Sequence, residues 1–346
     1  MRRDRVVLLG FQLVVACSED DASDAATAMT GNTAMVAAAA GHTAADTSTN
    51  AAPSGAGAAA QGGVTSTPVM AGSGSAGVTA AAGATAPARV EPVPGSCCPD
   101  GKCLCRGDAP SSLSDAAGPY TVMQHTVMGV GCVYYPSDAV PPFAAVAIAD
   151  GFGGGGGCDS VQTHEWGPLY ASHGIVAMIV ETGTGAQPDA RGESLTKGIA
   201  AFKSENEQRS SPLFGKLAGR YGTSGFAMGG GGAIIAAKAD ATLLSSVAVM
   251  PWGPVDDGVE VPTLIICGAS DGIAPCSAYG EKAYASVGAS VPKMRVTVMS
   301  EYAGQPSAAA GDSGAHALAF QKLFLEGDQR WRPLLIAAKS DETTIR

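Results

Sequence analysis

Short apolar runs alternate with helix-like segments from about residue 110 onward, and this alternation constrains the fold more than any other feature. The runs lie at 144–150, 175–182, 245–251, 262–268 and 295–300. Each is nearly continuous in apolar residues and is bounded by turn residues, which is typical of strands that helices cover on both faces. The segments between them read as helices: "HEWGPLYASHG", "SLTKGIAAFKSENEQ", "SAYGEKAYASV" and "HALAFQKLFLEGD". We therefore predict an α/β fold with a central, mostly parallel sheet flanked by helices, opened by antiparallel edge strands near 118–138.

The chain before this region has a different composition. No aromatic residue occurs between Phe11 and Tyr120, and no lysine or arginine between Arg5 and Arg89. A segment of Ala, Gly, Ser and Thr with scattered Pro buries too little apolar surface to offset the entropy of ordering it. We predict a disordered tether over 17–95, a Cys-rich segment over 96–109, and the folded domain over 110–346.

The first sixteen residues resemble an export signal. A basic start with Arg2, Arg3 and Arg5 precedes an apolar stretch that is too short to span a bilayer. The stretch ends in "LVVAC", which resembles a bacterial lipobox, so we expect a lipid on Cys17 and a protein anchored to the cell envelope. An ordinary signal peptide that releases a secreted protein is the alternative.

The cysteine count agrees with export. The chain has nine cysteines, and eight remain if Cys17 carries lipid, an even number that suits disulfides in an oxidising compartment. Four cluster before the domain, namely Cys97, Cys98, Cys103 and Cys105, for which disulfides are favoured over a metal site because paired CxxC motifs are absent. Cys132 and Cys158 form a plausible pair. Cys267 and Cys276 bracket a short turn and are expected to be bridged.

Charge and glycine patterns exclude several functions. The net charge is −10 with no basic cluster in the folded region, which argues against nucleic acid or an anionic membrane surface as a partner. The glycine runs lack the G-K-[ST] of a phosphate loop. We expect no nucleotide, metal or other cofactor, and a monomer that binds an ester, lipid or polyester.

Candidate site residues follow the predicted strands, where ligands bind in parallel α/β sheets. Phe152, Trp252 and Asp271 each come shortly after a strand. The stretch "GFAMGGGG" has the strand–turn–helix pattern of a nucleophile elbow, G-x-S-x-G, but with Ala227 at the serine position.

This stretch and seven others, in this order, resemble the bacterial cutinases and poly(ethylene terephthalate) hydrolases of the α/β-hydrolase superfamily. They are "GPYTVMQHTV" with "VYYP", "ADGFGG", "EWGPLYASHG", "GFAMGGGG", "MPWGP", "VPTLIICGASDGIAP" and "LAFQKLFLEGDQRW". Together they cover most of residues 117–333. The resemblance implies a serine carboxylic ester hydrolase that forms an acyl-enzyme intermediate.

The resemblance also assigns roles to residues. The nucleophile position is Ala227, the acid is Asp271, and the base position is Ala303 in "KMRVTVMSEYA". The backbone amides of Phe152 and Met228 would form the oxyanion hole. The substrate would contact Phe152, Trp252 and Ile273. With alanine at two triad positions, we predict a severely impaired or inactive hydrolase; a protein that binds a lipid, ester or polymer without cleaving it is the alternative.

Other side chains are poor replacements for the missing groups. Ser224 lies inside the predicted strand and is expected to be a buried serine bonded to backbone. His316 is expected to be a solvated residue at a helix start, and His173 a helix C-cap or a satisfied core residue. His125 on an early strand and His42 in the tether are remote. His164 is nearest the predicted site and is the one candidate for a replacement base.

Overall fold

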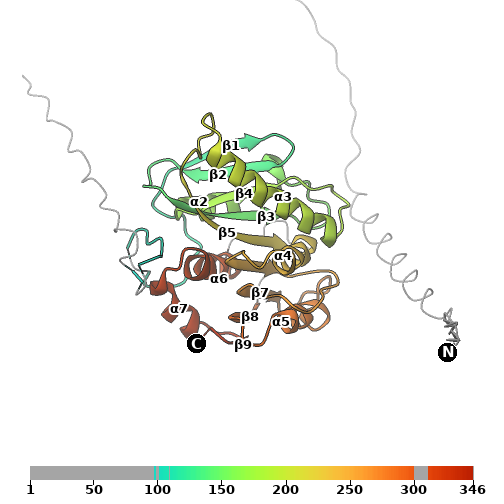
Figure 1. Ribbon diagram of the computed structural model, residues 1–346. Helices are drawn as coiled ribbons and strands as arrows, with labels where there is room; N and C mark the ends of the chain where they lie inside the picture. Colours follow the sequence, from blue (N-terminus) through green and yellow to red (C-terminus); the bar gives the residue numbers. More distant parts are fainter. Residues whose placement is uncertain (1–96, 99–100, 109, 300–310, 346) are drawn as a thin grey trace, which may run out of the picture. The chain divides into compact units, whose positions relative to one another are not determined.

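The computed structural model describes residues 97–98, 101–108, 110–299 and 311–345 (Figure 1). These residues belong to one compact unit, residues 83–346. The signal, Cys17, the tether, His42 and Ala303 lie outside the described residues. No helix in the described part of the chain combines the length and the apolar character needed to cross a membrane.

A single sheet of nine strands forms the centre of the domain, in the order β1-β2-β4-β3-β5-β6-β7-β8-β9. The pairs from β4 through β3 to β8 are parallel, whereas β1–β2, β2–β4 and β8–β9 are antiparallel. The strands are Val122–Val127, Gly131–Pro136, Phe143–Ala149, Val176–Val180, Leu217–Phe226, Ser245–Val249, Thr263–Gly268, Lys293–Val298 and Glu342–Thr343. This is an α/β-hydrolase fold, so the predicted fold class and the antiparallel opening strands are confirmed; the antiparallel strand β9 at the other edge was not predicted.

Helices cover both faces of the sheet (Figure 1). On one face lie α2, α6 and α7, and on the other α3, α4 and α5. Their bounds are Trp166–Ser172 for α2, Pro188–Glu207 for α3, Met228–Ala239 for α4, Glu281–Ser286 for α5, Gly311–Phe320 for α6 and Arg332–Ala337 for α7. Short 3-10 segments are η2 (Gly157–Asp159) and η5 (Gln329–Trp331), and π-helical turns are η3 (Cys276–Gly280) and η4 (Gln321–Leu325).

The packing of strand β3 explains why its sequence is apolar throughout. Ala144, Val146 and Ile148 pack into the core under α2 and α6, while the alternate residues Phe143 and Ala147 pack under α3 and α4. Since successive side chains of a strand point to opposite faces, a strand between two helical layers needs apolar residues at every position. The sheet is thereby fixed between two cores, and its strand ends form a rigid edge for a site.

The Cys-rich segment packs against the C-terminal part of the domain. Leu104 is buried in the core, and its amide donates to the carbonyl of Glu326 at 2.8 Å. The buried Arg106 lies 3.6 Å from the Glu326 carboxylate and donates to the carbonyls of Val140 and Pro142. Arg330 donates to the Arg106 carbonyl at 3.2 Å. Residues 101–108 are thus built into the domain through buried charged contacts.

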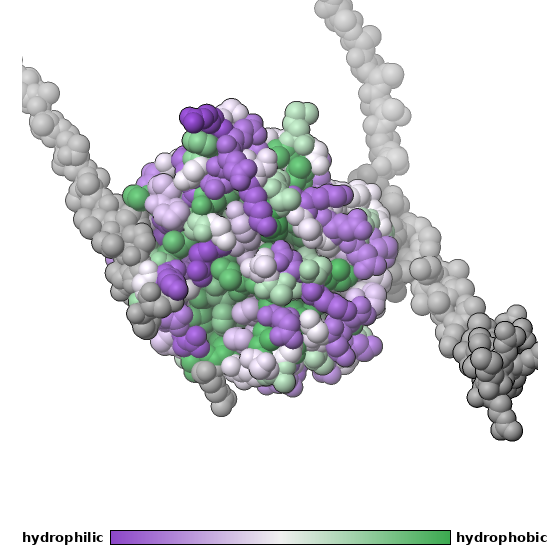
Figure 2. Space-filling view, viewed as in Figure 1, coloured by the Kyte–Doolittle hydropathy of each residue, from purple (hydrophilic) through white to green (hydrophobic). Residues whose placement is uncertain are grey.

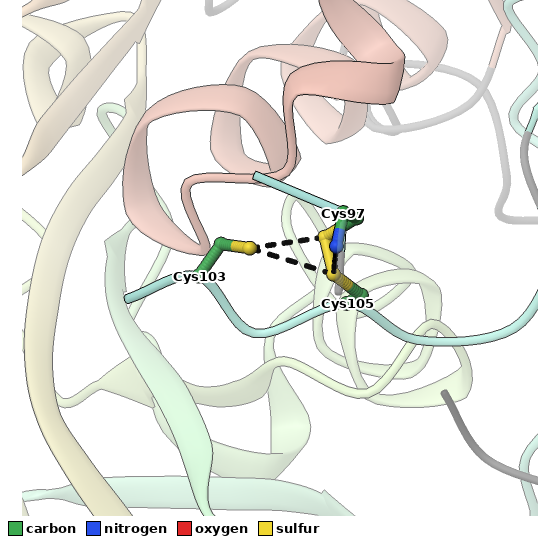
Figure 3. A group of neighbouring side chains, drawn as sticks. All are labelled: Cys97, Cys103 and Cys105. Atoms are coloured by element: carbon green, nitrogen blue, oxygen red, sulfur yellow. Dashed lines mark hydrogen bonds between the residues drawn. A yellow bond between two sulfur atoms is a disulfide. The ribbon is translucent and has the colours of Figure 1, made fainter. Parts of the chain in front are cut away.

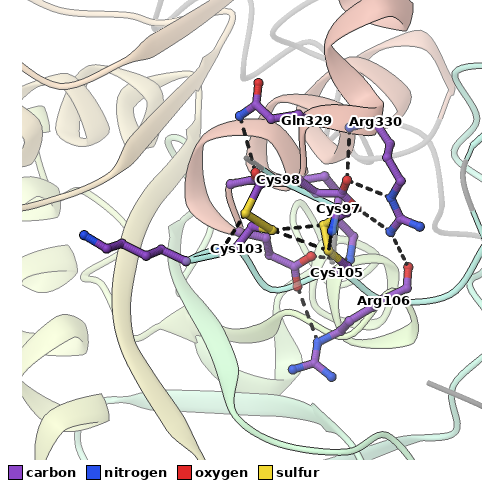
Figure 4. The surroundings of a disulfide bond; sticks show 12 residues. Cys97, Cys98, Cys103, Cys105, Arg106, Gln329 and Arg330 are labelled. Carbon is purple, nitrogen blue, oxygen red and sulfur yellow. Dashed lines mark hydrogen bonds and ion pairs between the residues drawn. A yellow bond between two sulfur atoms is a disulfide. The ribbon is translucent and has the colours of Figure 1, made fainter. Parts of the chain in front are cut away.

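Four disulfides are present in the described residues. The Cys-rich segment holds Cys97–Cys105 and Cys98–Cys103, a connectivity that the sequence left open (Figures 3 and 4). The sulfur atoms of Cys97, Cys103 and Cys105 all lie within 4.8 Å of one another, which two nested disulfides in so short a segment explain. The other two bridges are Cys132–Cys158, with Cα atoms 4.9 Å apart, and Cys267–Cys276, with Cα atoms 5.4 Å apart.

Candidate active site

Ala227 occupies a sharp turn between the end of β5 and the start of α4. Its backbone has φ 51° and ψ −115°, a conformation that costs about 1–3 kcal/mol for a residue with a Cβ. The flanking Gly225 and Gly229 are required by close approach: a Cβ on Gly225 would collide with the carbonyl of Gly229, and one on Gly229 with that of Ala149. The turn has the backbone of a nucleophile elbow, with a methyl group where the hydroxyl would be.

Three hydrogen bonds hold the elbow in this strained conformation. The Ala227 amide donates to the Val249 carbonyl at 2.9 Å. The Ala227 carbonyl accepts from Trp252 N at 2.9 Å and from Gly231 N at 3.1 Å. The first two bonds join the elbow to the end of the neighbouring strand β6. The second bond also places the Trp252 backbone directly beside position 227.

The loop after β3 lies against the elbow. A Cβ added to Gly151 would be 2.9 Å from the Ala227 Cβ, so the backbone before Phe152 passes directly over the turn. Neither the Phe152 amide nor the Met228 amide donates a hydrogen bond to another described residue. Met228 is the first residue of α4, where amides have no partner within the helix. Two free N–H groups therefore flank Ala227, as an oxyanion hole requires.

Asp271 lies in the turn after β7, which neighbours β6 and β8 in the sheet. The carboxylate is buried, and its Oδ1 accepts hydrogen bonds from the amides of Ile273 and Ala274, both at 2.8 Å. The Cys267–Cys276 disulfide closes the same loop. These contacts fix the carboxylate at the carboxyl edge of the sheet, on the side toward β8.

The base position, Ala303, falls in the stretch 300–310 that the structure does not describe. Strand β8 ends at Val298 and pairs with β7, with Gly268 opposite Val298. The chain therefore enters that stretch beside the strand that carries Asp271. The Ala227…Asp271…Ala303 arrangement stays a prediction.

Apolar side chains project from the loops at this edge. Phe152 is 62% exposed and Ile273 is 55% exposed. The Trp252 ring lies 5.7 Å from the Tyr279 ring, measured between centroids. The loops carrying Phe152 and Trp252 thus meet at Ala227, and Ile273 follows Asp271. On the face that Figure 2 shows, hydrophilic and hydrophobic residues are interspersed.

Ser224 and His316 do not provide the missing groups. Ser224 is fully buried in β5, and its hydroxyl has no hydrogen-bond partner in the described part of the chain, where a backbone partner was expected. Burial is also the main cause that raises the pKa of the Tyr170 hydroxyl. His316 was expected at a solvated helix start, and this was wrong: it lies inside α6, with Nδ1 2.7 Å from the Asp312 carbonyl and a buried Nε2.

The remaining histidines have structural partners. His173 caps the C-terminus of α2, as expected, and its Nε2 lies 2.9 Å from the Ala116 carbonyl. Burial lowers the pKa of His173 to about 4, and the positive charge of Lys322 adds to the effect. His125 in β1 lies 3.4 Å from Glu205. His164 is half-exposed, 3.8 Å from Glu165, which leaves its ring directed toward a surface carboxylate.

The sequence reasoning missed the polar groups that hold the loop after β3. Asp150 is fully buried and accepts from Gly156 N and Ser160 Oγ, both at 2.8 Å. Arg191 is also fully buried and donates to the Asp150 carbonyl at 2.8 Å. The sequence does contain a signal for this arrangement. Asp150 is a charged residue between an apolar strand and a glycine run.

Comparisons with known proteins agree with this geometry. The model of the family described as PET hydrolase-like matches residues 101–345. A bis(hydroxyethyl) terephthalate hydrolase from Streptomyces coelicolor is 30% identical over 256 residues, which cover 69% of this chain and 79% of that protein. Cutinase 1 from Thermobifida cellulosilytica is 29% identical over 250 residues, 68% of this chain and 92% of the other. Lipase 1 from a Moraxella species is 29% identical over 208 residues, 54% of this chain and 60% of the other.

Proposed function

Because this chain belongs to the PET hydrolase-like family, we propose that its folded part is a cutinase-like ester hydrolase domain with severely impaired turnover. The observation that carries the proposal is Ala227. The elbow keeps its strained backbone (φ 51°) between two free amides, yet the side chain at its tip has no oxygen that can attack an ester.

The expected chemistry shows what is lost. In a complete site, a serine at position 227 attacks the ester carbonyl, and a histidine at position 303 takes its proton. The Asp271 carboxylate orients that histidine, and the amides of Phe152 and Met228 bind the oxyanion of the tetrahedral intermediate. Alanine at both positions removes the attacking atom and the proton acceptor. The oxyanion hole and substrate binding alone leave roughly 10³–10⁴-fold acceleration over water in well-studied serine hydrolases.

Binding without cleavage is the second candidate, and the aromatic wall favours it. The Trp252 and Tyr279 rings lie 5.7 Å apart, and the exposed Phe152 follows Gly151, whose Cβ position lies against Ala227. Aromatic faces of this kind hold acyl or aryl groups by burial and ring contacts. The similar Streptomyces protein is named for bis(hydroxyethyl) terephthalate, so we include an aromatic diester among the lipid, ester and polyester ligands of this cleft.

The N-terminal sequence supports a proposal for the cellular location of the protein. We propose that Cys17 carries a lipid and anchors the protein to a bacterial envelope, with the domain held away from the membrane by the tether. The support is the basic and apolar start that ends in "LVVAC".

One pair of measurements separates the two candidates. We expect p-nitrophenyl butyrate hydrolysis near the uncatalysed rate and no labelling by a serine-directed fluorophosphonate. Equilibrium binding of bis(hydroxyethyl) terephthalate, followed by Trp252 fluorescence with Trp252→Ala as the control, then decides whether the cleft still holds an ester. Normal turnover, or stoichiometric labelling at any serine, would refute the loss of catalysis.

A further inference from the structure

The loop that carries Phe152 has little stiffness of its own. Its sequence, "GFGGGGG" at 151–157, contains glycine at every position except Phe152. Glycine has the widest choice of backbone conformations, and Gly153, Gly156 and Gly157 all adopt positive φ here, at 79°, 73° and 69°. The direction of the Phe152 N–H must therefore be set by contacts from outside this loop segment.

Gln162 supplies two such contacts. Its Oε1 accepts from the Gly151 amide at 2.8 Å, and its Nε2 donates to the Phe152 carbonyl at 2.8 Å. The Phe152 N–H belongs to the peptide unit between Gly151 and Phe152. The two bonds of Gln162 fix the peptide unit on each side of it, which restricts its rotation about the chain direction.

Gln162 packs closely against the glycine loop. A Cβ on Gly154 would lie 2.7 Å from the Gln162 Oε1 and 2.5 Å from the Asp150 Oδ2. A Cβ on Gly151 would lie 3.2 Å from the same Oε1. The glycine run therefore lets the backbone approach the side-chain amide closely enough to bond on both sides of Phe152.

Asp150 places Gln162 by holding its neighbours. The buried carboxylate accepts from Ser160 Oγ at 2.8 Å and from the hydroxyl of Thr163, the residue next to Gln162. Ser160 Oγ also accepts from the Thr163 amide at 2.9 Å. On the other side, Gly153 N donates to the Thr184 carbonyl at 2.9 Å. The loop is thus held at Asp150, directly after β3, and at Thr184, shortly after β4.

We propose that Gln162 is the positioning residue that aims the Phe152 N–H at an ester carbonyl oxygen, with Asp150 holding Gln162 in place. The inference rests on the proposed function, in which that N–H is half of the oxyanion hole. Loss of one oxyanion donor lowers kcat by about 10²–10³-fold in serine hydrolases. A donor that is present but free to rotate loses part of that effect, since alignment must then be attained in the transition state.

The first test needs no catalysis, so Ala227 and Ala303 are left unchanged in every variant. Gln162→Met keeps the length of the side chain but removes both hydrogen bonds, and Gln162→Glu keeps an acceptor for Gly151 N while losing the donor to Phe152. Amide hydrogen exchange at Gly151 should become at least about 10-fold faster in Gln162→Met and change little in Gln162→Glu. Gln208→Met is the matched control, because Gln208 is exposed at the end of α3 and its side chain donates to Ser210 Oγ at 2.9 Å, far from the Phe152 loop in sequence. Unchanged exchange in Gln162→Met would overturn the proposal.

The second test uses the Ala227→Ser/Ala303→His variant as the parent. Both Gln162→Met and Gln162→Glu should lower its kcat on p-nitrophenyl butyrate about 10- to 100-fold, with KM within about threefold and Gln208→Met without effect. A merely structural role would change stability or KM instead, so a kcat within twofold of the parent would refute positioning. If the parent itself is inert, the proposed function fails, and the exchange measurement still decides the role of Gln162.

Discussion

Acid should destabilise the domain through His173. The ring lies at the C-terminus of α2, where Nε2 donates to the Ala116 carbonyl and the main-chain carbonyl accepts from Lys322 Nζ. Burial, with the Lys322 charge, lowers the pKa of His173 to about 4, against about 6.5 in an unfolded chain. Between these two values the unfolded chain binds a proton that the folded chain does not. The stability that neutral His173 permits is therefore present above pH 6.5 and is lost as the pH falls toward 4.

The size of the effect follows from proton linkage. One pKa unit corresponds to about 1.4 kcal/mol, so lowering the pH from 7 to 4.5 should remove about 2–3 kcal/mol of unfolding free energy through this residue. His173→Gln is the matched variant, because its amide still donates to Ala116 but does not titrate. Urea unfolding at both pH values gives the difference between the two proteins. If the parent and His173→Gln lose the same free energy between pH 7 and 4.5, the buried neutral histidine is not the cause.

Three further predictions concern the scaffold. Cys267→Ser should lower the free energy of unfolding by about 2–3 kcal/mol, because the bridge closes a short loop around Asp271; an unchanged urea midpoint would contradict this. Gly229→Ala should destabilise the fold by at least about 2 kcal/mol, since its Cβ would collide with the Ala149 and Asp150 carbonyls, and a thermal melt measures it. Cys17→Ser should abolish palmitate labelling and move the protein from the membrane to the soluble fraction of the producing cells; retention in the membrane fraction would refute the anchor.

The fold was predictable because its signals are local and repeated. Each run such as 144–150 and 262–268 must be apolar on both faces to lie between two helical layers, and this requirement is visible in the sequence. Strand β9 (Glu342–Thr343) was missed because two polar residues at an edge leave no periodic signal. His316 was misplaced because α6 begins at Gly311, five residues before the apolar pattern that predicted the helix.

For the site, the sequence allowed only single candidate residues to be predicted, at positions that follow strands. Ala227, Asp271 and Trp252 could be singled out as candidates because the elbow and strand-end patterns are short in sequence. The contacts of Gln162 and Asp150 could not be predicted, since they depend on two side chains meeting a glycine loop in space. The pairing within the Cys-rich segment was likewise open, because four cysteines allow three pairings.

The central claim is that this domain keeps the frame of an ester hydrolase and lacks only the reacting groups at positions 227 and 303. The most direct measurement is p-nitrophenyl butyrate turnover of Ala227→Ser, Ala303→His and the double variant, with Asp271→Asn added to the last. Triad members act as a unit, so we predict near-background rates for each single change, measurable turnover for the double variant, and its loss with Asp271→Asn. A double variant that is folded but inert would contradict the account and favour a cleft that only binds its ligand.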